Sequence, residues 1–546
     1  MSGTHDVVNQ VEPRTDVNEF TTNTPLVEAV ERYDAGWAVL ELERTGALVG
    51  TASFQHDAEL ANTHEPELVP FDRTGHRIDE VEYHPAYHRI IGDAVAAGAH
   101  TSAWADPRPG ANVARAATFM LFAQVEPGHA CPISMTHSVV PALAVDDGLA
   151  AEWLPRVLSR EYDPVLHAGK RSALFGMAMT EKQGGSDVRA NTTLAVDAGD
   201  GSHRLTGHKW FCSAPMSDGF LVLAKTGAGL SCFLVPRVLP DGTRNTFLIQ
   251  RLKDKLGNRS NASSEIELDG TIGFLLGEDG RGVRTIIEMV ARTRLDCVYG
   301  STAGMRQATA EALWHVRRRA AFGALLVDQP AMTAVVADLA LESEAATAVS
   351  MRLARAHDAD APEADRSFRR LATAVSKYWI CKRGPGHAAE ALECLGGNGY
   401  TEAFPLARRY REQPVMAVWE GSGNVIALDV LRAISREPES LDAFDAEVGL
   451  AAGADGLLDA HLARTSRLAR EVAALAAAPE TAAEAAGQAR RLVSSLALSL
   501  QASLLVRTAP AAVAEGFVQA RLGASRGLLP GELPAGLGLR EILARA

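Results

Sequence analysis

Apolar residues recur at intervals of three and four over the first part of the chain, which is the spacing of an amphipathic helix. The stretches HRIIGDAVAAGAH and ANVARAATFMLFAQVE show this spacing most clearly. The pattern predicts an N-terminal helical domain over residues 1–170. About the first 40 residues are polar and lack periodicity, and we expect them to form an extended arm.

The pattern changes over residues 171–283, where short alternating or β-rich runs replace the helical spacing. Examples are HRLTGHKWFCS, GFLVLAKT, SCFLVPRV and SSEIELDG. Gly, Asn and Asp residues separate these runs, as they do at turns between strands. The segment is therefore predicted to be a compact middle β domain.

Helical spacing returns over residues 284–436, for example in TAVVADLALESEAATAVSMRLARAH, and predicts a helical-bundle domain. Residues 437–546 are rich in Ala and Leu with polar breaks, and predict an extra C-terminal helical domain. The fold class is therefore α+β. Alternating βα units do not occur, so a doubly wound sheet is not expected, and any nucleotide cofactor is held by something other than a Rossmann turn.

Composition narrows the function without changing this picture. The chain has 546 residues and a net charge of −13, which opposes non-specific attraction to nucleic acid or anionic membranes. We see no signal peptide and no apolar run long enough to cross a bilayer, and the six cysteines show no CxxC spacing. These features predict a cytoplasmic protein with reduced thiols and without a membrane partner.

Motifs of several common enzyme classes do not occur. The sequence has no GxGxxG after a strand, no P-loop, no HExxH and no GxSxG. His84 and His88 have the i, i+4 spacing that can bind a metal, but Pro85 indicates the start of a helix and no third ligand is near. We therefore predict no metal site.

The stretch GMAMTEKQGGSDVRANTT, residues 176–193, stands where the β domain begins. Gly184 and Gly185 let backbone amides approach a ligand closely, and Thr180 and Ser186 add hydroxyl donors beside them. Such a loop suits the edge of a flavin and a pyrophosphate. A hydrogen-bonded turn that caps a strand is the alternative.

A single carboxylate, Glu420, stands between Trp419 and a glycine–serine–glycine turn in AVWEGSGN. The sequence predicts that a helix resumes directly after this turn. A carboxylate partly removed from water beside an apolar wall is a good general base. The alternative is a glutamate at a helix N-terminus, stabilised by the macrodipole.

Five motifs occur in the order and rough spacing of the acyl-CoA dehydrogenase flavoprotein superfamily, which the chain resembles: MTEKQGGSDV, HKWFCS, RRAAFG, LGGNGY and VWEGSGN. Further stretches, such as YHPAYH, CPISMT and RLKDKLGNRSNAS, are similar to its AidB-like, alkylation-response members. The resemblance implies a helical domain, a flavin-binding β-barrel domain, a four-helix bundle and an extra helical domain. It also implies an FAD-dependent oxidoreductase that oxidises the Cα–Cβ bond of a small-molecule substrate, an acyl thioester.

The resemblance further implies a set of cofactor-binding residues. They are Met177, Met179, Thr180, Gly185, Ser186, Phe211, Cys212, Ser213, Arg319, Phe322, Gly396, Gly397, Trp419, Gly421, Ser422 and Asn424. By the same resemblance, Phe211 packs on the flavin ring, and Arg319 and Phe322 meet the FAD of a neighbouring subunit. The site is then built across a subunit contact, and we expect a homotetramer.

Two catalytic residues are expected from the same resemblance. Glu420 matches the base that removes the α-proton, while the β-hydrogen leaves as hydride to flavin N5. Arg294, in RTRLDC, matches an arginine near the base, and a structural salt bridge is the alternative. The sequence identifies neither the acyl chain nor the electron acceptor.

Two positions depart from the common pattern of the superfamily. Phe211 stands where many members have tryptophan, and Glu393 stands where the common motif has a glutamine near the cofactor phosphates. A glutamate at that position would repel a pyrophosphate unless it is turned away or paired. The AidB-like members share this change, so FAD remains the expected cofactor.

The AidB-like resemblance also implies an alternative function, an FAD-containing protein that binds DNA and protects it from alkylation, with weak or vestigial dehydrogenase activity. Residues 441–546 contain 10 arginines, no lysine and 11 acidic residues, which gives a net charge of −1. This charge does not support DNA as a partner, although Arg464, Arg467 and Arg470 are spaced to share a local patch. Oxidation of a nitrogen or hydroxyl group on the same scaffold is a third alternative.

Overall fold

The chain folds into two compact units, each built from segments that are separated in the sequence. The computed structural model describes residues 3–524 and 527–546. The first unit comprises Met1–Ala52, Arg108–Gln124 and Cys297–Ala546, and the second comprises Ser53–Pro107 and Val125–Asp296. The four domains predicted from the sequence stay a prediction, because each unit combines segments from more than one of them.

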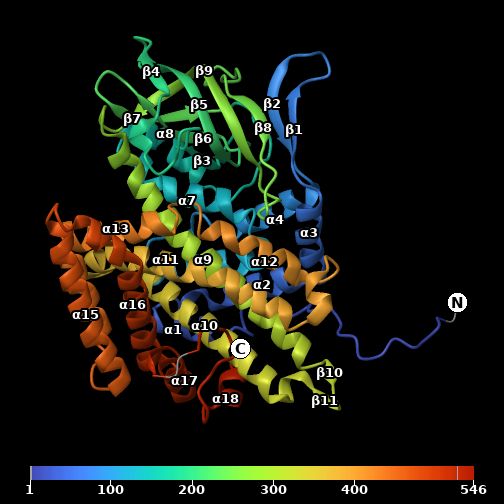
Figure 1. Cartoon of the computed structure of the whole chain (residues 1–546). Coiled ribbons are helices and arrows are strands. Elements are labelled where there is room, and N and C mark those ends of the chain that lie inside the picture. The colour runs from blue at the N-terminus through green and yellow to red at the C-terminus, as the bar shows by residue number, and fades with distance from the viewer. Residues whose placement is uncertain (1–2, 525–526) are drawn as a thin grey trace. The chain divides into compact units, whose positions relative to one another are not determined.

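The first unit is mainly helical (Figure 1). Its helices are α1 (Thr24–Arg32), α2 (Val39–Gly50), α6 (Ala111–Ala123), α10 (Pro330–Arg355), α11 (Glu363–Glu393), α12 (Pro405–Met416), α13 (Gly423–Arg436), α14 (Glu439–Gly449), α15 (Gly456–Ala477), α16 (Ala482–Thr508), α17 (Ala511–Leu522) and α18 (Leu539–Leu543). Three short 3-10 turns, η1 (Gly36–Ala38), η3 (Leu326–Asp328) and η4 (Gly396–Tyr400), and a small hairpin of β10 (Ala320–Ala321) and β11 (Ala324–Leu325) complete it. Helix α9 (Gly282–Val316) begins in the second unit and ends in the first.

The N-terminal arm is shorter than the sequence pattern predicted, because α1 already begins at Thr24. Pro25 occupies the first turn, where its missing N–H is not needed. Leu26, Ala29 and Val30 then fall at helical spacing and are buried. This short apolar stripe is enough to fix a helix within an otherwise polar segment.

The helices after residue 436 share a core with the bundle that precedes them. Ala312 of α9 and Leu341 of α10 lie in one buried cluster with Leu505, Phe517 and Ile542 from α16, α17 and α18. Figure 1 shows α15 and α16 side by side in orange and red. Burying each large apolar side chain contributes about 1.5–3 kcal/mol, so the C-terminal segment stabilises the bundle directly.

The second unit combines helices with β-strands (Figure 1). Its helices are α3 (Ala52–Thr63), α4 (Pro85–Ala96), α5 (Ser102–Ala105), α7 (Ala130–Leu143), α8 (Asp147–Val157) and the short 3-10 turn η2 (Val188–Ala190). Its strands are β1 (Glu67–Phe71), β2 (Arg77–Glu82), β3 (Phe175–Ala178), β4 (Leu194–Asp197), β5 (His203–Ser213), β6 (Gly219–Lys225), β7 (Leu230–Pro236), β8 (Leu248–Leu252) and β9 (Ser263–Leu276).

Seven of these strands form one sheet with the order β3-β6-β4-β5-β9-β7, and β8 also pairs with β9. A further pairing between β6 and β7 closes the sheet into a barrel. The barrel interior holds Phe220, Phe233, Phe247 and Ile266, all buried. The predicted α+β fold with a middle β-barrel is confirmed.

Strands β1 and β2 form an antiparallel hairpin inside the zone predicted to be helical. The turn between them is organised by Asp72, whose Oδ1 accepts hydrogen bonds from the backbone N–H groups of Thr74 and His76. The hairpin was missed because it is only two short strands within a long helical pattern. At its end, His84 and Pro85 begin α4 as predicted, and the His84 ring accepts a hydrogen bond from the backbone N–H of Ala86.

The described residues contain neither a membrane-spanning helix nor a metal-binding cluster. None of their helices is long and apolar enough to cross a membrane. Within the same residues, no three His, Cys, Asp or Glu side chains gather where they could hold a metal ion.

A buried carboxylate organises the turn that leads into α7. Glu126 accepts hydrogen bonds from the backbone N–H groups of Gly128 and His129, at 3.0 and 2.8 Å. The Ser260 hydroxyl and the Asn62 side-chain amide donate to Oε1, the same oxygen that accepts from Gly128. Burial alone would raise the pKa of Glu126, but the bonds from His129 and Ser260 outweigh it and lower the pKa to about 2.

This arrangement predicts a pH-dependent stability. The folded pKa of Glu126 lies below its ordinary value of 4.5, so the ionised carboxylate stabilises the fold above that pH. The contribution, about 3 kcal/mol, is lost as the pH falls from 4.5 towards 2. We expect Glu126→Gln to lower the free energy of unfolding at pH 7 and to flatten its fall between pH 5 and pH 3, measured by urea unfolding. Glu161→Gln, at an exposed site, is the control, and parallel pH curves for wild type and Glu126→Gln would contradict the account.

Candidate functional site

In the second unit, the loop that follows β3 is built around a buried carboxylate, Glu181. Both of its oxygens accept hydrogen bonds from the backbone N–H and hydroxyl groups of Thr192 and Thr193. The Lys209 ammonium donates to Oε1 at 2.8 Å, and both side chains of this ion pair are fully buried. Glu181 therefore joins the two ends of the loop to strand β5.

The ionisation of this pair follows from its surroundings. Burial alone would raise the pKa of Glu181, but the hydrogen bonds from Lys209, Thr192 and Thr193 outweigh it and hold the pKa well below its usual range. Burial lowers the pKa of Lys209, and the attraction of Glu181 offsets part of that effect. We therefore treat the pair as charged, and as the anchor of the loop.

The predicted ligand residues of this loop lie around the anchor. Thr180 is half-buried, and its backbone carbonyl accepts a hydrogen bond from the N–H of Trp210. Gly185 and Ser186 are exposed. A Cβ added at Gly185 would lie 2.5 Å from the Thr180 hydroxyl, so only glycine lets the loop close against Thr180. Met177 is buried and Met179 half-buried on the strand side of the loop.

A β-bulge orients the end of β5. Leu205 and Lys209 face inward at the period of a strand, and the register then shifts between Lys209 and Cys212. Because of this shift Phe211 points outward, with half of its surface exposed, while Cys212 is buried in the barrel core. Burial raises the pKa of the Cys212 thiol to about 12, so this residue offers a ligand its backbone rather than its sulfur.

Aromatic rings and hydroxyls line the surface beside the bulge. The rings of Trp210 and Phe211 meet edge to face, with centroids 6.5 Å apart. The Lys253 ammonium lies 3.3 Å from the Trp210 centroid and 4.7 Å from that of Phe211. The Ser213 hydroxyl lies 3.2 Å from that of Ser263. This surface therefore offers an exposed aromatic face with a hydroxyl beside it, and the Lys253 ammonium there is already paired with Glu265 at 2.5 Å.

In the first unit, Glu420 stands in a turn between α12 and α13, and helix α13 begins at Gly423 as predicted. Its φ is +57°, a left-handed conformation that is uncommon for residues other than glycine. Gly421 follows with φ +106°, and a Cβ added to it would lie 2.9 Å from Ile426. The turn thus needs glycine at position 421, whereas position 420 carries a carboxylate in spite of the strain.

The turn that carries Glu420 packs on an apolar cluster and is bound by one buried lysine. Trp419 packs with Cys297, Cys381 and Met416. The ammonium of Lys377, on α11, donates to the backbone carbonyls of Trp419 and Gly421.

At the start of α13, Arg490 of α16 donates to the Asn424 amide oxygen at 2.8 Å. Asn424, one of the predicted cofactor ligands, is therefore hydrogen-bonded to the C-terminal segment. Glu420 is half-buried, Gly421 is half-buried, and Ser422 is exposed as the N-cap residue of α13.

The remaining predicted residues lie on other elements. Phe322 is fully exposed at the tip of the β10–β11 hairpin, and Arg319 donates to the backbone carbonyl of Asn9. Gly396 and Gly397 are exposed in η4. Arg294 is half-buried on the part of α9 that belongs to the second unit. The predicted residues therefore divide between the two units.

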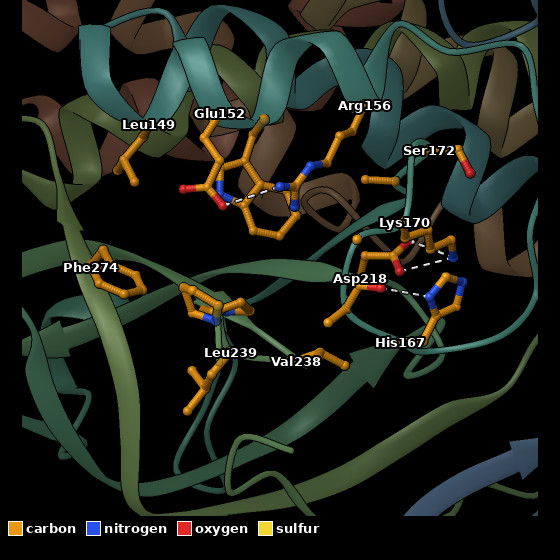
Figure 2. Close-up of a pocket in the computed structure, with 16 residues that line it drawn as sticks. Leu149, Glu152, Arg156, His167, Lys170, Ser172, Asp218, Val238, Leu239 and Phe274 are labelled. Atoms are coloured by element: carbon orange, nitrogen blue, oxygen red, sulfur yellow. Dashed lines mark hydrogen bonds and ion pairs between the residues drawn. The ribbon is translucent and has the colours of Figure 1, made fainter. Parts of the chain in front are cut away.

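A separate hollow of about 330 Å³ lies in the second unit and contains none of the predicted residues. It is lined by α8, the loop after it and strand ends, as Figure 2 shows. Its cations already have carboxylate partners: Lys170 pairs with Asp218 at 2.9 Å, Arg156 with Glu152 at 3.5 Å, and His167 with Asp163 at 2.8 Å. The hollow therefore presents balanced charge to a ligand.

Comparisons with known proteins define the class. Residues 176–271 match the family "Acyl-CoA dehydrogenase, middle domain" and residues 280–435 match "Acyl-CoA dehydrogenase, C-terminal domain". Residues 9–164 match "Adaptive response protein AidB N-terminal domain". The chain therefore belongs to the acyl-CoA dehydrogenase family, whose members are FAD-dependent oxidoreductases acting on CH–CH donors.

Individual relatives place it within that family. The Escherichia coli (strain K12) protein "Putative acyl-CoA dehydrogenase AidB" is 47% identical over 474 residues, which cover 86% of this chain and 88% of that protein. "Acyl-CoA dehydrogenase family member 11" of Caenorhabditis elegans is 30% identical over 420 residues, covering 73% of this chain and 67% of that protein. The crystal structure of C. elegans ACDH-11 in complex with C11-CoA has a TM-score of 0.85 at 25% identity, covering 95% of this chain and 93% of that one.

The described residues of the second unit fit the ring system of FAD. Phe211 offers an exposed aromatic face, and Ser213 and Ser186 offer hydroxyls. Gly185 leaves the loop backbone uncovered, and the fit against Thr180 requires that it be glycine. Sequence reasoning predicted these residues as cofactor ligands, and that assignment stays a prediction. It missed Glu181 and Lys209, which anchor the loop that carries Gly185 and Ser186. The signal was present, because a lysine at an inward-facing position of β5 requires a buried acidic partner.

The loop anchor generates a test. Glu181→Gln leaves the Lys209 ammonium buried without a charged partner, and breaking such a pair costs about 3–5 kcal/mol. We expect the free energy of unfolding to fall by that order and the FAD content per purified chain to drop. Asp187→Asn removes an exposed carboxylate from the same loop and should keep both values. A Glu181→Gln variant with wild-type stability and FAD content would refute the anchor role.

Proposed function

We propose that this protein oxidises the Cα–Cβ bond of an acyl thioester, with Glu420 as the base that removes the α-proton. The observation that carries the proposal is the left-handed backbone of Glu420 beside Gly421. A glycine would adopt this conformation without strain, whereas another residue there costs about 1–2 kcal/mol. Strain of this kind clusters at functional sites, and the carboxylate is what Glu420 adds to the turn.

The surroundings of Glu420 support a role in acid–base chemistry. Trp419 and its apolar cluster shield one side of the turn from water. The Trp419 indole N–H is itself buried, and among the described residues it has no hydrogen-bond partner. Because buried donors are rarely left unsatisfied, this N–H is expected to bond to a ligand or a water in the site.

The proposed reaction balances as a two-electron oxidation. Glu420 takes the α-proton as the β-hydrogen leaves with its electron pair, and the thioester becomes a 2-enoyl thioester. FAD, when bound, supplies the acceptor for that hydride. Arg294 is proposed to assist the base, Phe211 to pack on the flavin ring, and Thr180, Ser186 and Ser213 to donate hydrogen bonds to the cofactor.

The C. elegans relative suggests the first substrate to try. Its structure was solved with C11-CoA, and the match spans nearly the whole of both chains. We propose that this protein accepts an acyl-CoA, and undecanoyl-CoA is the substrate chosen for testing.

We also propose a homotetramer whose subunits share the cofactor. The fully exposed Phe322, at the hairpin tip with φ +50°, is supported as a contact residue because a large apolar side chain in such a place favours burial by a partner. Arg319 lies on the same hairpin, and Gly396 and Gly397 are exposed in η4. Light scattering of the purified protein tests the assembly.

The described arginines give no support to the DNA-associated alternative. Arg464 and Arg467 are exposed on α15, but Arg470 lies 3.6 Å from Asp445, and Arg490 donates to Asn424. We therefore propose the dehydrogenase function alone.

Glu420→Gln tests the proposed base. The amide cannot accept the proton, so we expect FAD to be retained and kcat with undecanoyl-CoA to fall by about 10²–10⁴-fold. Exchange of the substrate α-protons with D2O, followed by mass spectrometry, should fall in parallel. Glu439→Gln is the matched control, because it removes a glutamate from the first turn of another helix, α14, and tests the macrodipole alternative. Wild-type exchange and turnover in Glu420→Gln would exclude this residue as the base.

A further inference from the structure

A buried lysine binds the turn that carries Glu420. Lys377 lies on α11 with 1% of its surface exposed. Its ammonium donates a 2.9 Å hydrogen bond to the carbonyl of Trp419 and a second bond to the carbonyl of Gly421. These carbonyls belong to the residues directly before and after Glu420.

The two bonds fix the backbone of Glu420. The Trp419 carbonyl sets the plane of the peptide that precedes Glu420, and the Gly421 carbonyl sets the plane of the peptide that follows Gly421. Holding both planes restrains the torsions between them, which include the φ values of +57° and +106°. Hydrogen bonds from a charged donor are stronger than neutral ones, so they are suited to hold a strained conformation.

The choice of a lysine is itself informative. Burying an ammonium is unfavourable unless it is well satisfied, and buried cations are usually paired with carboxylates. The partners recorded for Lys377 are carbonyls, and both lie in this one turn. The buried ammonium is therefore satisfied by this turn, through two charge-assisted hydrogen bonds.

We propose that Lys377 is the positioning residue of the catalytic base: it holds the left-handed turn that presents the Glu420 carboxylate to the substrate α-carbon. The statement that Lys377 presents the base rests on the proposed function, because it assumes that Glu420 is that base. That Lys377 holds the turn is a statement about the protein alone. The two parts are measured separately.

The test replaces Lys377 by methionine, which has a similar length and no donor. Amide hydrogen exchange of the peptide covering residues 417–424 is followed by mass spectrometry in the purified flavoprotein. We expect faster exchange in this peptide and unchanged exchange in the core helices. Arg366→Met is the matched control, because it removes an exposed charge from the same helix, where its ion-pair partner is Glu363, and it should leave the peptide unchanged.

The catalytic consequence is measured with two thioesters. With undecanoyl-CoA, we expect Lys377→Met to lower kcat by about 10²-fold, the effect of a small misplacement, with little change in KM. The second is 3-thiaundecanoyl-CoA, whose α-proton is removable but whose β-position is sulfur and has no hydride to give. Deprotonation of this compound beside oxidised flavin gives a long-wavelength charge-transfer band, and we expect the band to be lost in Lys377→Met while FAD content is kept.

Each outcome has one meaning. Wild-type kcat, charge-transfer band and peptide exchange in a folded Lys377→Met variant would overturn the positioning role. Loss of FAD together with unchanged exchange in residues 417–424 would also overturn it, because the lysine would then act only on general stability. If Lys377→Met does not fold, Lys377→Gln, neutral but still a donor, is measured against the same expectations with an intermediate effect. A charge-transfer band that survives in Glu420→Gln would refute the proposed base, and the exchange measurement would still decide whether Lys377 holds the turn.

Discussion

A buried charge that is satisfied by a turn constrains that turn more strongly than any apolar contact, because leaving the charge unsatisfied is unfavourable by several kcal/mol. In each unit, a buried charge of this kind holds a loop or turn that carries predicted site residues. In the second unit the Glu181 carboxylate collects the N–H and hydroxyl groups of Thr192 and Thr193 and the Lys209 ammonium. In the first unit the Lys377 ammonium collects two carbonyls around Glu420. The exposed residues nearby, such as Ser186 and Phe211, are accessible to a ligand.

The C-terminal segment, residues 437–546, also supports the part of the first unit that carries Glu420. Its helices complete the core of the bundle, with Phe517 and Ile542 among the buried residues. Arg490 of α16 reaches the beginning of α13 and bonds to Asn424, four residues after Glu420. The segment that follows the acyl-CoA dehydrogenase match, which ends at residue 435, is therefore joined to the helix after Glu420 by packing and by a hydrogen bond.

Periodicity and turn chemistry predicted much of this fold. The order of helical and β segments, the resumption of a helix after Glu420 and the helix start at Pro85 all follow from local residue patterns. The β1–β2 hairpin and the early start of α1 did not, because short elements give weak periodic signals. The exposed face of Phe211 depends on a bulge in β5, which shifts the alternation by one residue and leaves no mark in the sequence.

The partners of the buried charges were the hardest to predict, since they lie far apart along the chain. Lys209 is 28 residues from Glu181, and Lys377 is 42 residues from Trp419. The motif around Glu420 could be recognised from its residues, but the lysine beneath it could be found only once α11 and the turn were placed together.

We propose that this chain removes hydrogen from the α and β carbons of an acyl thioester. An anaerobic absorbance scan of the purified protein tests it most directly, with undecanoyl-CoA and then short and branched acyl-CoAs added in turn. We expect at least one of them to bleach the oxidised FAD spectrum and to yield the 2-enoyl thioester. A stable yellow protein that no acyl-CoA reduces would contradict it.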